Sequence, residues 1–134
     1  MWRGKNIYYD DSGIPHEAEG EIRVSNEVIA DITAHAASGI RGFVRFTETI
    51  VDGFAKFFTQ GDLTEGILVR HAGDNPTERS VEIELSIVVQ YGMVVQEVAE
   101  EIQRIVKERV EELTGITVAR VHVNIQGIAP EKKM

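Results

Sequence analysis

The sequence contains no cysteine. This absence excludes disulfide bonds, cysteine-based zinc sites and a cysteine nucleophile, and it is compatible with a reducing cytosol. The chain nevertheless has enough material for one globular domain, because its 134 residues are 43% hydrophobic and 27% charged. We expect a core of ordinary size that needs no covalent staple.

Long apolar runs are also absent. No segment approaches the roughly 18 consecutive apolar residues that cross a bilayer, and residues 1–11 lack the apolar centre of a signal peptide. These features predict a cytoplasmic protein, without direct membrane insertion, that would need a partner to stay near a membrane. The net charge of −8 and the pI of about 5.0 disfavour binding to nucleic-acid phosphates and anionic lipid headgroups.

Sequence motifs of catalysis and of cofactor binding are missing as well. No serine lies in a G-x-S-x-G context, and neither the phosphate loop G-x-x-x-x-G-K-[ST] nor the dinucleotide fingerprint G-x-G-x-x-G occurs. The histidines have no metal-ligand spacing; they are His16, His35, His71 and His122. We therefore predict no catalytic, cofactor-binding or metal-binding residue, and no enzyme.

Two segments have the period of amphipathic helices. Residues 26–38 carry an apolar stripe, with Ser25 as the N-cap and Gly39 expected to end the helix in a left-handed conformation. Residues 93–113 form the clearest pattern, and Gly115 closes it. Expected ion pairs on this second helix are Glu100 with Arg104 and Lys107 with Glu111.

Alternation of apolar and polar residues predicts strands at 22–24, 67–71, 80–91 and 117–126. In the last strand, Ala119, Val121, Val123 and Ile125 are expected to face inward. Striped helices and one-sided strands favour a two-layer α+β fold, a mixed or antiparallel sheet of about four strands with helices packed on one face. The predicted organisation is a flexible N-terminal arm over 1–19, a single domain over 20–129 and a short tail over 130–134.

All five phenylalanines fall between Phe43 and Phe58. Residues 43–46 read either as a strand or as the start of a second helix, and residues 50–58 have helical spacing. The simpler interpretation packs these rings into the core. The alternative is an exposed docking patch for a partner or a second copy, made of Phe54, Phe57 and Phe58.

Charged residues on the outer faces of two predicted strands invite a functional interpretation. Glu82 and Glu84 lie on one strand, and Arg120 and His122 lie on another. If the strands are neighbours, cross-strand ion pairs account for all four residues. A catalytic carboxylate pair would need a cleft that raises one pKa, and an open sheet face offers none.

Gly39-Ile40-Arg41-Gly42 is a G-x-x-G sequence that follows a helix. In KH domains such a loop clamps a nucleic-acid backbone. A glycine at a helix end followed by a turn glycine gives the same string, and the acidic net charge favours that interpretation. A small KH-like RNA-binding module that uses this loop is the alternative function, and it requires a basic groove beside the loop.

Two blocks of sequence carry a family resemblance. The first runs from Gly20 to Ile32 and on to Gly42; the second contains Val89-Gln90-Tyr91-Gly92, Glu97-Val98-Ala99 and Thr114-Gly115. Together they resemble the alkaline-shock-protein family, also called the Gls general-stress family. The positions of this chain that match its pattern are Glu27, Tyr91, Gly92, Glu97 and Gly115.

The resemblance implies a bacterial, cytoplasmic, non-catalytic protein of the envelope stress response. It also implies protein partners, among them a membrane-anchored receptor, and self-association into homo-oligomers. Our hypothesis is therefore an adaptor or scaffold in cell-envelope homeostasis that acts through protein–protein contacts. An accessory subunit with a small-molecule pocket is a further alternative, and it requires a deep pocket with convergent polar groups.

Overall fold

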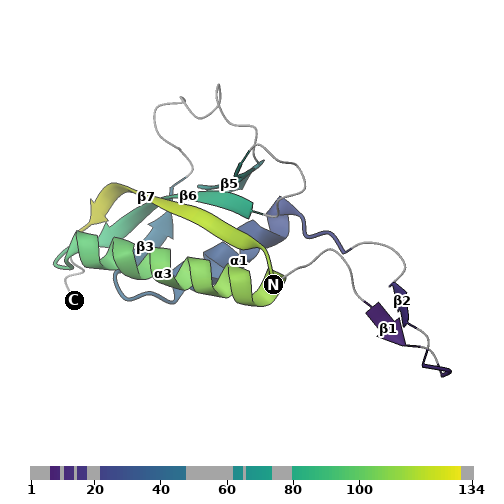
Figure 1. Ribbon diagram of the computed structural model, residues 1–134. Coiled ribbons are helices and arrows are strands. Elements are labelled where there is room, and N and C mark those ends of the chain that lie inside the picture. The colour runs from purple at the N-terminus through teal and green to yellow at the C-terminus, as the bar shows by residue number, and fades with distance from the viewer. Residues whose placement is uncertain are drawn as a thin grey trace.

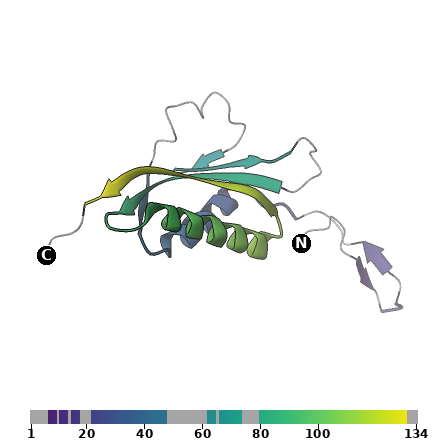
Figure 2. The same cartoon turned by 60° about the vertical axis from the view of Figure 1, so that its left-hand side comes forward.

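The computed structural model describes residues 7–9, 11–13, 15–17, 22–47, 62–64, 66–73 and 80–130. Its main body has two layers, with helices α1 (Asn26–Ser38) and α3 (Val95–Thr114) lying on one face of a sheet (Figures 1 and 2). The α+β prediction with helices on one face is confirmed. The sheet is mixed and has five strands among the described residues, where we expected about four.

The strand β6 (Ser80–Gln90) is the centre of the sheet. Along one edge it pairs in parallel with β7 (Thr117–Ala129), and α3 supplies the crossover that parallel neighbours need. Three antiparallel strands complete the sheet: β3 (Phe43–Phe46) and β5 (Ile67–His71) pair with β6, and β4 (Asp62–Thr64) pairs with β5. Of the two interpretations of residues 43–46, the strand is therefore correct.

Helix α1 begins and ends at the expected residues. The Ser25 hydroxyl accepts a hydrogen bond from the Val28 N–H at 3.2 Å, as an N-cap does. Gly39 has φ −84°, so our expectation of a left-handed residue there is wrong. The chain instead leaves the helix through a tight turn, because the Ile40 N–H bonds to the Ala37 carbonyl at 3.1 Å.

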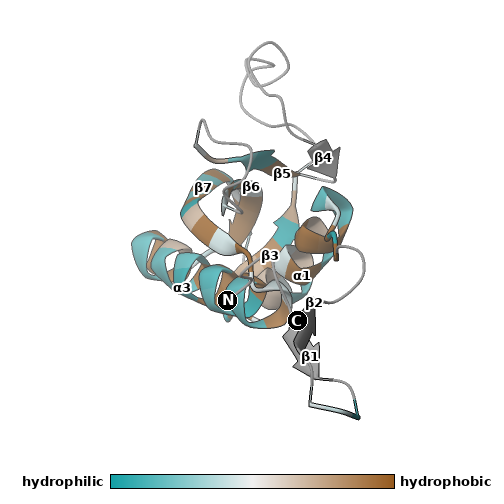
Figure 3. Ribbon diagram, turned by 45° about the vertical axis from the view of Figure 1, so that its right-hand side comes forward, coloured by the Kyte–Doolittle hydropathy of each residue, from teal (hydrophilic) through white to brown (hydrophobic). Residues whose placement is uncertain are grey.

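Helix α3 packs on the sheet through a stripe with a spacing of four residues. The buried members of this stripe are Val98, Ile102, Val106 and Val110. Figure 3 shows the hydrophilic side of α3 turned away from the sheet. Gly115 ends the helix at φ 76°, in the left-handed region that glycine tolerates, so this part of the prediction is confirmed.

The ion pairs on α3 are partly as predicted. Lys107 Nζ lies 2.8 Å from a Glu111 carboxylate oxygen, which confirms that pair. Arg104 bonds to Glu101 and Glu108, and the expected Glu100 partner is not used. Carboxylates three or four residues from Arg104 compete for one guanidinium, and Glu101 and Glu108 bind it.

The core lies between the helices and the inner face of the sheet. On β6 this face is made of Val81, Ile83, Leu85, Ile87 and Val89, each at most 7% exposed. Tyr91, the last residue of the predicted strand 80–91, lies beyond β6 and is 63% exposed. The opposite face is only partly exposed, because Leu68, Ser86 and Val88 are buried there.

Two further strand predictions need correction. Ile22 to Ser25 belong to no strand, and Ile22 is 60% exposed. In β7, a register shift between Val118 and Arg120 leaves Ala119 as an extra residue, exposed to solvent, while Val118 is 1% exposed. A bulge of this kind reverses the alternation on one side of it, so the inward set starts at Val118 and resumes at Val121.

The N-terminal segment contains a small separate sheet. β1 (Ile7–Tyr9) pairs antiparallel with β2 (Pro15–Glu17), and this hairpin lies apart from the main sheet in Figures 1 and 2. The predicted helix over 50–58, with Phe54, Phe57 and Phe58, lies outside the described residues. The predicted boundaries of arm, domain and tail stay predictions.

Candidate functional site

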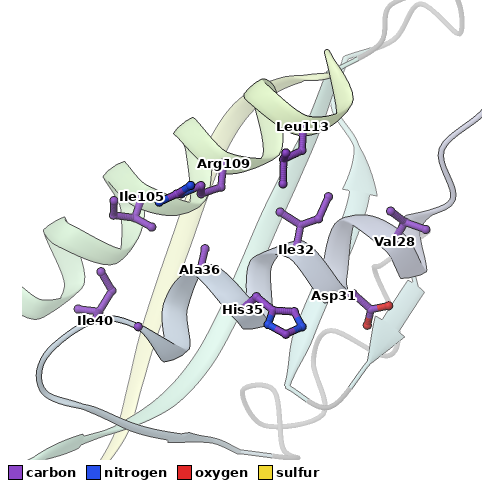
Figure 4. A pocket seen from close by; sticks show the side chains of 10 residues that line it. Val28, Asp31, Ile32, His35, Ala36, Ile40, Ile105, Arg109 and Leu113 are labelled. Carbon is purple, nitrogen blue, oxygen red and sulfur yellow. The ribbon is translucent and has the colours of Figure 1, made fainter.

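A groove of about 480 Å³ runs between α1 and α3 on the helical layer. Most of its lining is apolar and comes from both helices and the turn after α1: Val28, Ile32, Ala36, Ile40, Ile105 and Leu113. The helices run antiparallel, so the start of α1 lies beside the end of α3 (Figure 4). The groove therefore has one end at Val28 and Leu113 and the other at Ile40 and Ile105.

The end near Leu113 presents apolar side chains to solvent. Leu113 is 65% exposed and Val28 is 44% exposed, and Figure 4 shows Ile32 and Leu113 pointing toward each other across the groove. Leu113 is the last residue of the apolar pattern predicted over 93–113, yet it is exposed. It lies in the last turn of α3, next to the first turn of α1, where the interior ends.

Polar groups stand on the border of this groove. Asp31 and His35 project from the side of α1 that faces away from α3, and Arg109 comes from α3 (Figure 4). These three side chains do not converge on one point inside the groove. The deep pocket with convergent polar groups that a small-molecule site requires is therefore not formed here. An apolar groove with a polar border is typical of surfaces at which proteins bind one another.

A polar cluster on the outer face of the sheet centres on Glu82. Its carboxylate lies 3.1 Å from His122 Nε2, and 3.6 Å from both Arg70 and Arg120. The hydrogen bond with His122 is the largest influence and, with the two guanidinium groups, holds the pKa of Glu82 below its usual range despite partial burial. The predicted ion pairing is confirmed for Glu82.

Glu84 does not join this charge cluster, contrary to our expectation. Its carboxylate accepts a hydrogen bond from the Asn124 side-chain amide at 2.9 Å. His122 and Asn124 on β7 each contact the β6 carboxylate two residues before their own register partner. His122 lies opposite Glu84 but contacts Glu82, and Asn124 lies opposite Ser86 but contacts Glu84. The cluster around Glu82 joins strands, and the pKa of Glu82 is lowered, which is the opposite of the raised pKa of a general acid.

The G-x-x-G loop joins α1 to β3 and is fastened to the sheet. Gly42 has φ +96°, and its carbonyl accepts the Gln90 N–H at 2.8 Å. The hollow of about 330 Å³ beside this loop is bordered by Arg41, Glu97 and Glu101. A phosphate backbone would meet two carboxylates and one guanidinium there, so the groove lacks the basic character that the RNA-binding alternative requires.

The residues that match the family pattern lie at both ends of the helical layer. Glu27 is in the first turn of α1, and Gly115 follows the last turn of α3. Tyr91 and Gly92 form the turn between β6 and α3, and Glu97 follows in the first turn of α3. The structure thus brings Tyr91, Gly92 and Glu97 to one end of the molecule and Glu27 and Gly115 to the other.

Sequence reasoning missed the groove and its border. Neither Arg109 nor Leu113 was singled out as a site residue. Among the described residues, no group of three or more His, Asp and Glu side chains is placed to hold a metal ion. In the same part of the chain, no helix has the length and hydropathy required to cross a membrane.

Comparison with known proteins supports the family assignment. The chain is 32% identical to the uncharacterized protein YloU of Bacillus subtilis (strain 168) over 111 residues, which cover 81% of this chain and 88% of YloU. It is 29% identical to the uncharacterized protein Spy1614 of Streptococcus pyogenes serotype M6 over 112 residues, 82% of this chain and 88% of that protein.

A more distant relative is the uncharacterized protein YqhY of Bacillus subtilis (strain 168), 25% identical over 114 residues, 85% of this chain and 81% of YqhY. No solved structure matches the chain. Residues 15–130 match the alkaline shock protein 23 family, described as having a cell envelope-related function. The expected resemblance is thereby confirmed, and the chain belongs to the alkaline shock protein 23 family.

Proposed function

We propose that the protein is a non-catalytic adaptor or scaffold in cell-envelope homeostasis. It works in the cytoplasm, close to the membrane, and a membrane-anchored protein holds it there. The family's envelope-related function supports the setting. The described surface offers partners an apolar groove and offers substrates no convergent acid–base group.

The observation that carries this proposal is the exposed end of the groove between α1 and α3. Leu113 and Val28 leave apolar surface in water, a cost that a bound partner removes. A helix is the natural occupant, because two adjacent antiparallel helices present a groove into which the apolar side of a third helix fits. Asp31, His35 and Arg109 lie where they can pair with polar residues on that helix's flanks.

Pelleting with membranes tests this proposal. Purified protein is mixed with washed membranes of its own host and, separately, with protein-free vesicles of the same lipids. We expect it to pellet with the native membranes and to stay in solution with the vesicles. Leu113→Lys places a charge in the groove at an exposed position, and we expect its pelleted fraction to fall about tenfold, as for loss of a well-packed apolar contact.

Val44→Lys is the matched control. Val44 lies on β3 away from the groove and is 41% exposed, so this variant gains the same charge at a similar site. We expect it to pellet like the unaltered protein. An equal fall in the pelleted fraction of both variants would show that the added charge weakens binding wherever it lies, and that the groove is not the binding surface. Pelleting with the protein-free vesicles would contradict the proposed membrane-protein receptor, because lipid alone would then bind the chain.

A further inference from the structure

The outer edge of β7 has no strand beside it among the described residues. β7 is 13 residues long, and β6 is its one partner among the described strands. An unpaired strand of this length presents a row of main-chain N–H and C=O groups to any extended chain. The bonds along this edge show which part of it is free to pair, and the side chains beside that part determine which extended sequence would fit.

Side chains of α3 close the first part of this edge. A Glu111 carboxylate oxygen accepts the Val118 N–H at 2.9 Å, and Lys107 Nζ donates to the Val118 carbonyl at 2.9 Å. Gln103 donates to the Val121 carbonyl at 3.0 Å. These bonds show that the main-chain groups of Val118 and Val121 point away from β6.

The rest of the edge is open in the described structure. Main-chain direction alternates along a strand, so Val123 and Ile125 point their N–H and C=O groups the same way as Val121. No described side chain bonds to the β7 main chain beyond Val121. Residues 121–128 contain no lysine, proline or acidic residue that would repel an added strand, and a single register shift near Gln126 is the only interruption.

The side chains beside the open edge define what would fit. On the inner face, Val121, Val123 and Ile125 are only partly buried against the core. On the outer face, the side chains of Arg120 and His122 are 65% and 43% exposed, and their carboxylate partner lies on the β6 side. An added strand would therefore place an acidic residue beside the Arg120 guanidinium, at the start of the open edge, and apolar residues beside the valines.

We propose that the open edge of β7 binds an extended segment of a partner protein in which acidic and apolar residues alternate. β7 already pairs with such a sequence on its other side, since β6 contributes Glu82-Ile83-Glu84-Leu85. A second copy of β7 fits poorly, because this strand has no acidic residue to set against Arg120. The inference extends the proposed adaptor function to a second surface, separate from the helical groove.

The test uses the full-length purified protein and fluorescein-labelled ten-residue peptides. One peptide alternates glutamate and valine, and the other alternates lysine and valine. We expect fluorescence anisotropy to show about tenfold tighter binding of the glutamate peptide at low salt, because Arg120 attracts a cross-strand glutamate and repels a lysine. We expect Arg120→Glu to weaken this binding about tenfold and to strengthen binding of the lysine peptide.

Arg45→Glu is the matched control, since it reverses the same charge at an exposed position on β3, which pairs with the edge of β6 opposite to β7. We expect it to bind both peptides as the unaltered protein does, and circular dichroism confirms that each variant is folded. Equal binding of the two peptides, or equal effects of the two variants, overturns the proposal. No binding of either peptide at millimolar concentration also overturns it.

Sedimentation of the protein alone decides whether a second copy takes the edge instead. Val123→Pro removes one outward N–H, a change that edge strands tolerate. A dimer that this variant abolishes would assign the edge to self-association and overturn the partner proposal. Because these tests contain no membrane, their failure leaves the pelleting result, and with it the proposed function, unaffected.

Discussion

At the scale of single residues, Glu82 shows how a charged side chain on a sheet face acquires its role. It draws Arg70, Arg120 and His122 from strands on both sides of β6. Alternation placed Glu82, Arg120 and His122 on outer faces, but their contact depended on β6 and β7 being neighbours, and Arg70 was not singled out. The pairing of Glu84 with Asn124 was not foreseeable, because the lean of side chains along a parallel ladder depends on register.

Glu82→Gln should lower the free energy of unfolding by about 1 kcal/mol at pH 7, as expected for a charge-assisted hydrogen bond in partial contact with solvent. The pKa of Glu82 is lower in the folded chain than its ordinary value of 4.5, so the carboxylate stabilises the fold above that pH. The contribution disappears as the pH falls from about 5 toward 3, because the unfolded chain takes up the proton first.

Urea unfolding at pH 7 and at pH 3, followed by circular dichroism, checks this. The difference in free energy of unfolding between Glu82→Gln and the unaltered protein should be smaller at pH 3 than at pH 7. Glu112→Gln, which removes the same charge from an exposed position on α3, is the control and should unfold like the unaltered protein at both pH values. A difference that stays constant with pH would mean that the amide disturbs packing and that the charge is irrelevant.

Gly42 and Gly92 separate two reasons for keeping a glycine. Both have positive φ, +96° and +94°. A Cβ on Gly92 would meet no atom within 4 Å, whereas one on Gly42 would lie 2.9 Å from Val98 Cγ2 and 3.1 Å from Met93 Cε. Gly92→Ala should therefore cost about 1 kcal/mol from backbone conformation, and Gly42→Ala about 1–3 kcal/mol more from overpacking.

Thermal unfolding of both glycine variants measures the difference. Equal losses of stability would show that Val98 and Met93 move aside without cost.

At the scale of elements, the long helix was predictable and its two ends were less so. A four-residue spacing of Val98, Ile102, Val106 and Val110 determines which side of α3 is buried. The sequence pattern continues to Leu113, but burial stops because α1 has only begun there. Periodicity describes one helix, while burial at its ends depends on how far its neighbours extend.

The strand β7 shows the same limit in a different form. Its alternation predicted Ala119, Val121, Val123 and Ile125 as the inward set. The bulge at Ala119 places Val118 inside instead, and nothing in the local sequence marks that residue as the extra one. Register shifts arise from the pairing of two strands, so a pattern within one strand does not reveal them.

Ile102→Ala and Leu113→Ala test this account of α3 within one helix. Ile102 is fully buried, so its truncation should cost about 2–4 kcal/mol from lost burial and a residual cavity. Leu113 is 65% exposed, so its truncation should change the free energy of unfolding by less than about 1 kcal/mol. Chemical denaturation gives both values, and a comparable loss at Leu113 would show that the end of the groove is structural.

At the scale of the whole molecule, the charge balance predicts that nucleic acid is not a partner. With a net charge of −8 and two carboxylates beside the G-x-x-G loop, the protein should not bind a labelled single-stranded RNA even at low salt. Anisotropy with a mixed-sequence oligonucleotide checks this. Binding that weakens on Arg41→Glu would restore the nucleic-acid alternative.

The layer architecture was predictable from the sequence because it follows from striped helices and alternating strands. The groove between α1 and α3 was not, since it is formed by residues about 70 positions apart whose exposure depends on how the two helices pack. The open edge of β7 likewise depends on strand order, which the sequence left open.

The central claim is that a membrane protein, and not the lipid, holds this chain at the envelope. The most direct measurement compares pelleting of the purified protein with native host membranes before and after protease treatment of those membranes, with the protease removed beforehand. The account predicts that the protein pellets with untreated membranes and remains in solution after the membrane proteins are digested. Equal pelleting with treated and untreated membranes, or none with either, would contradict it.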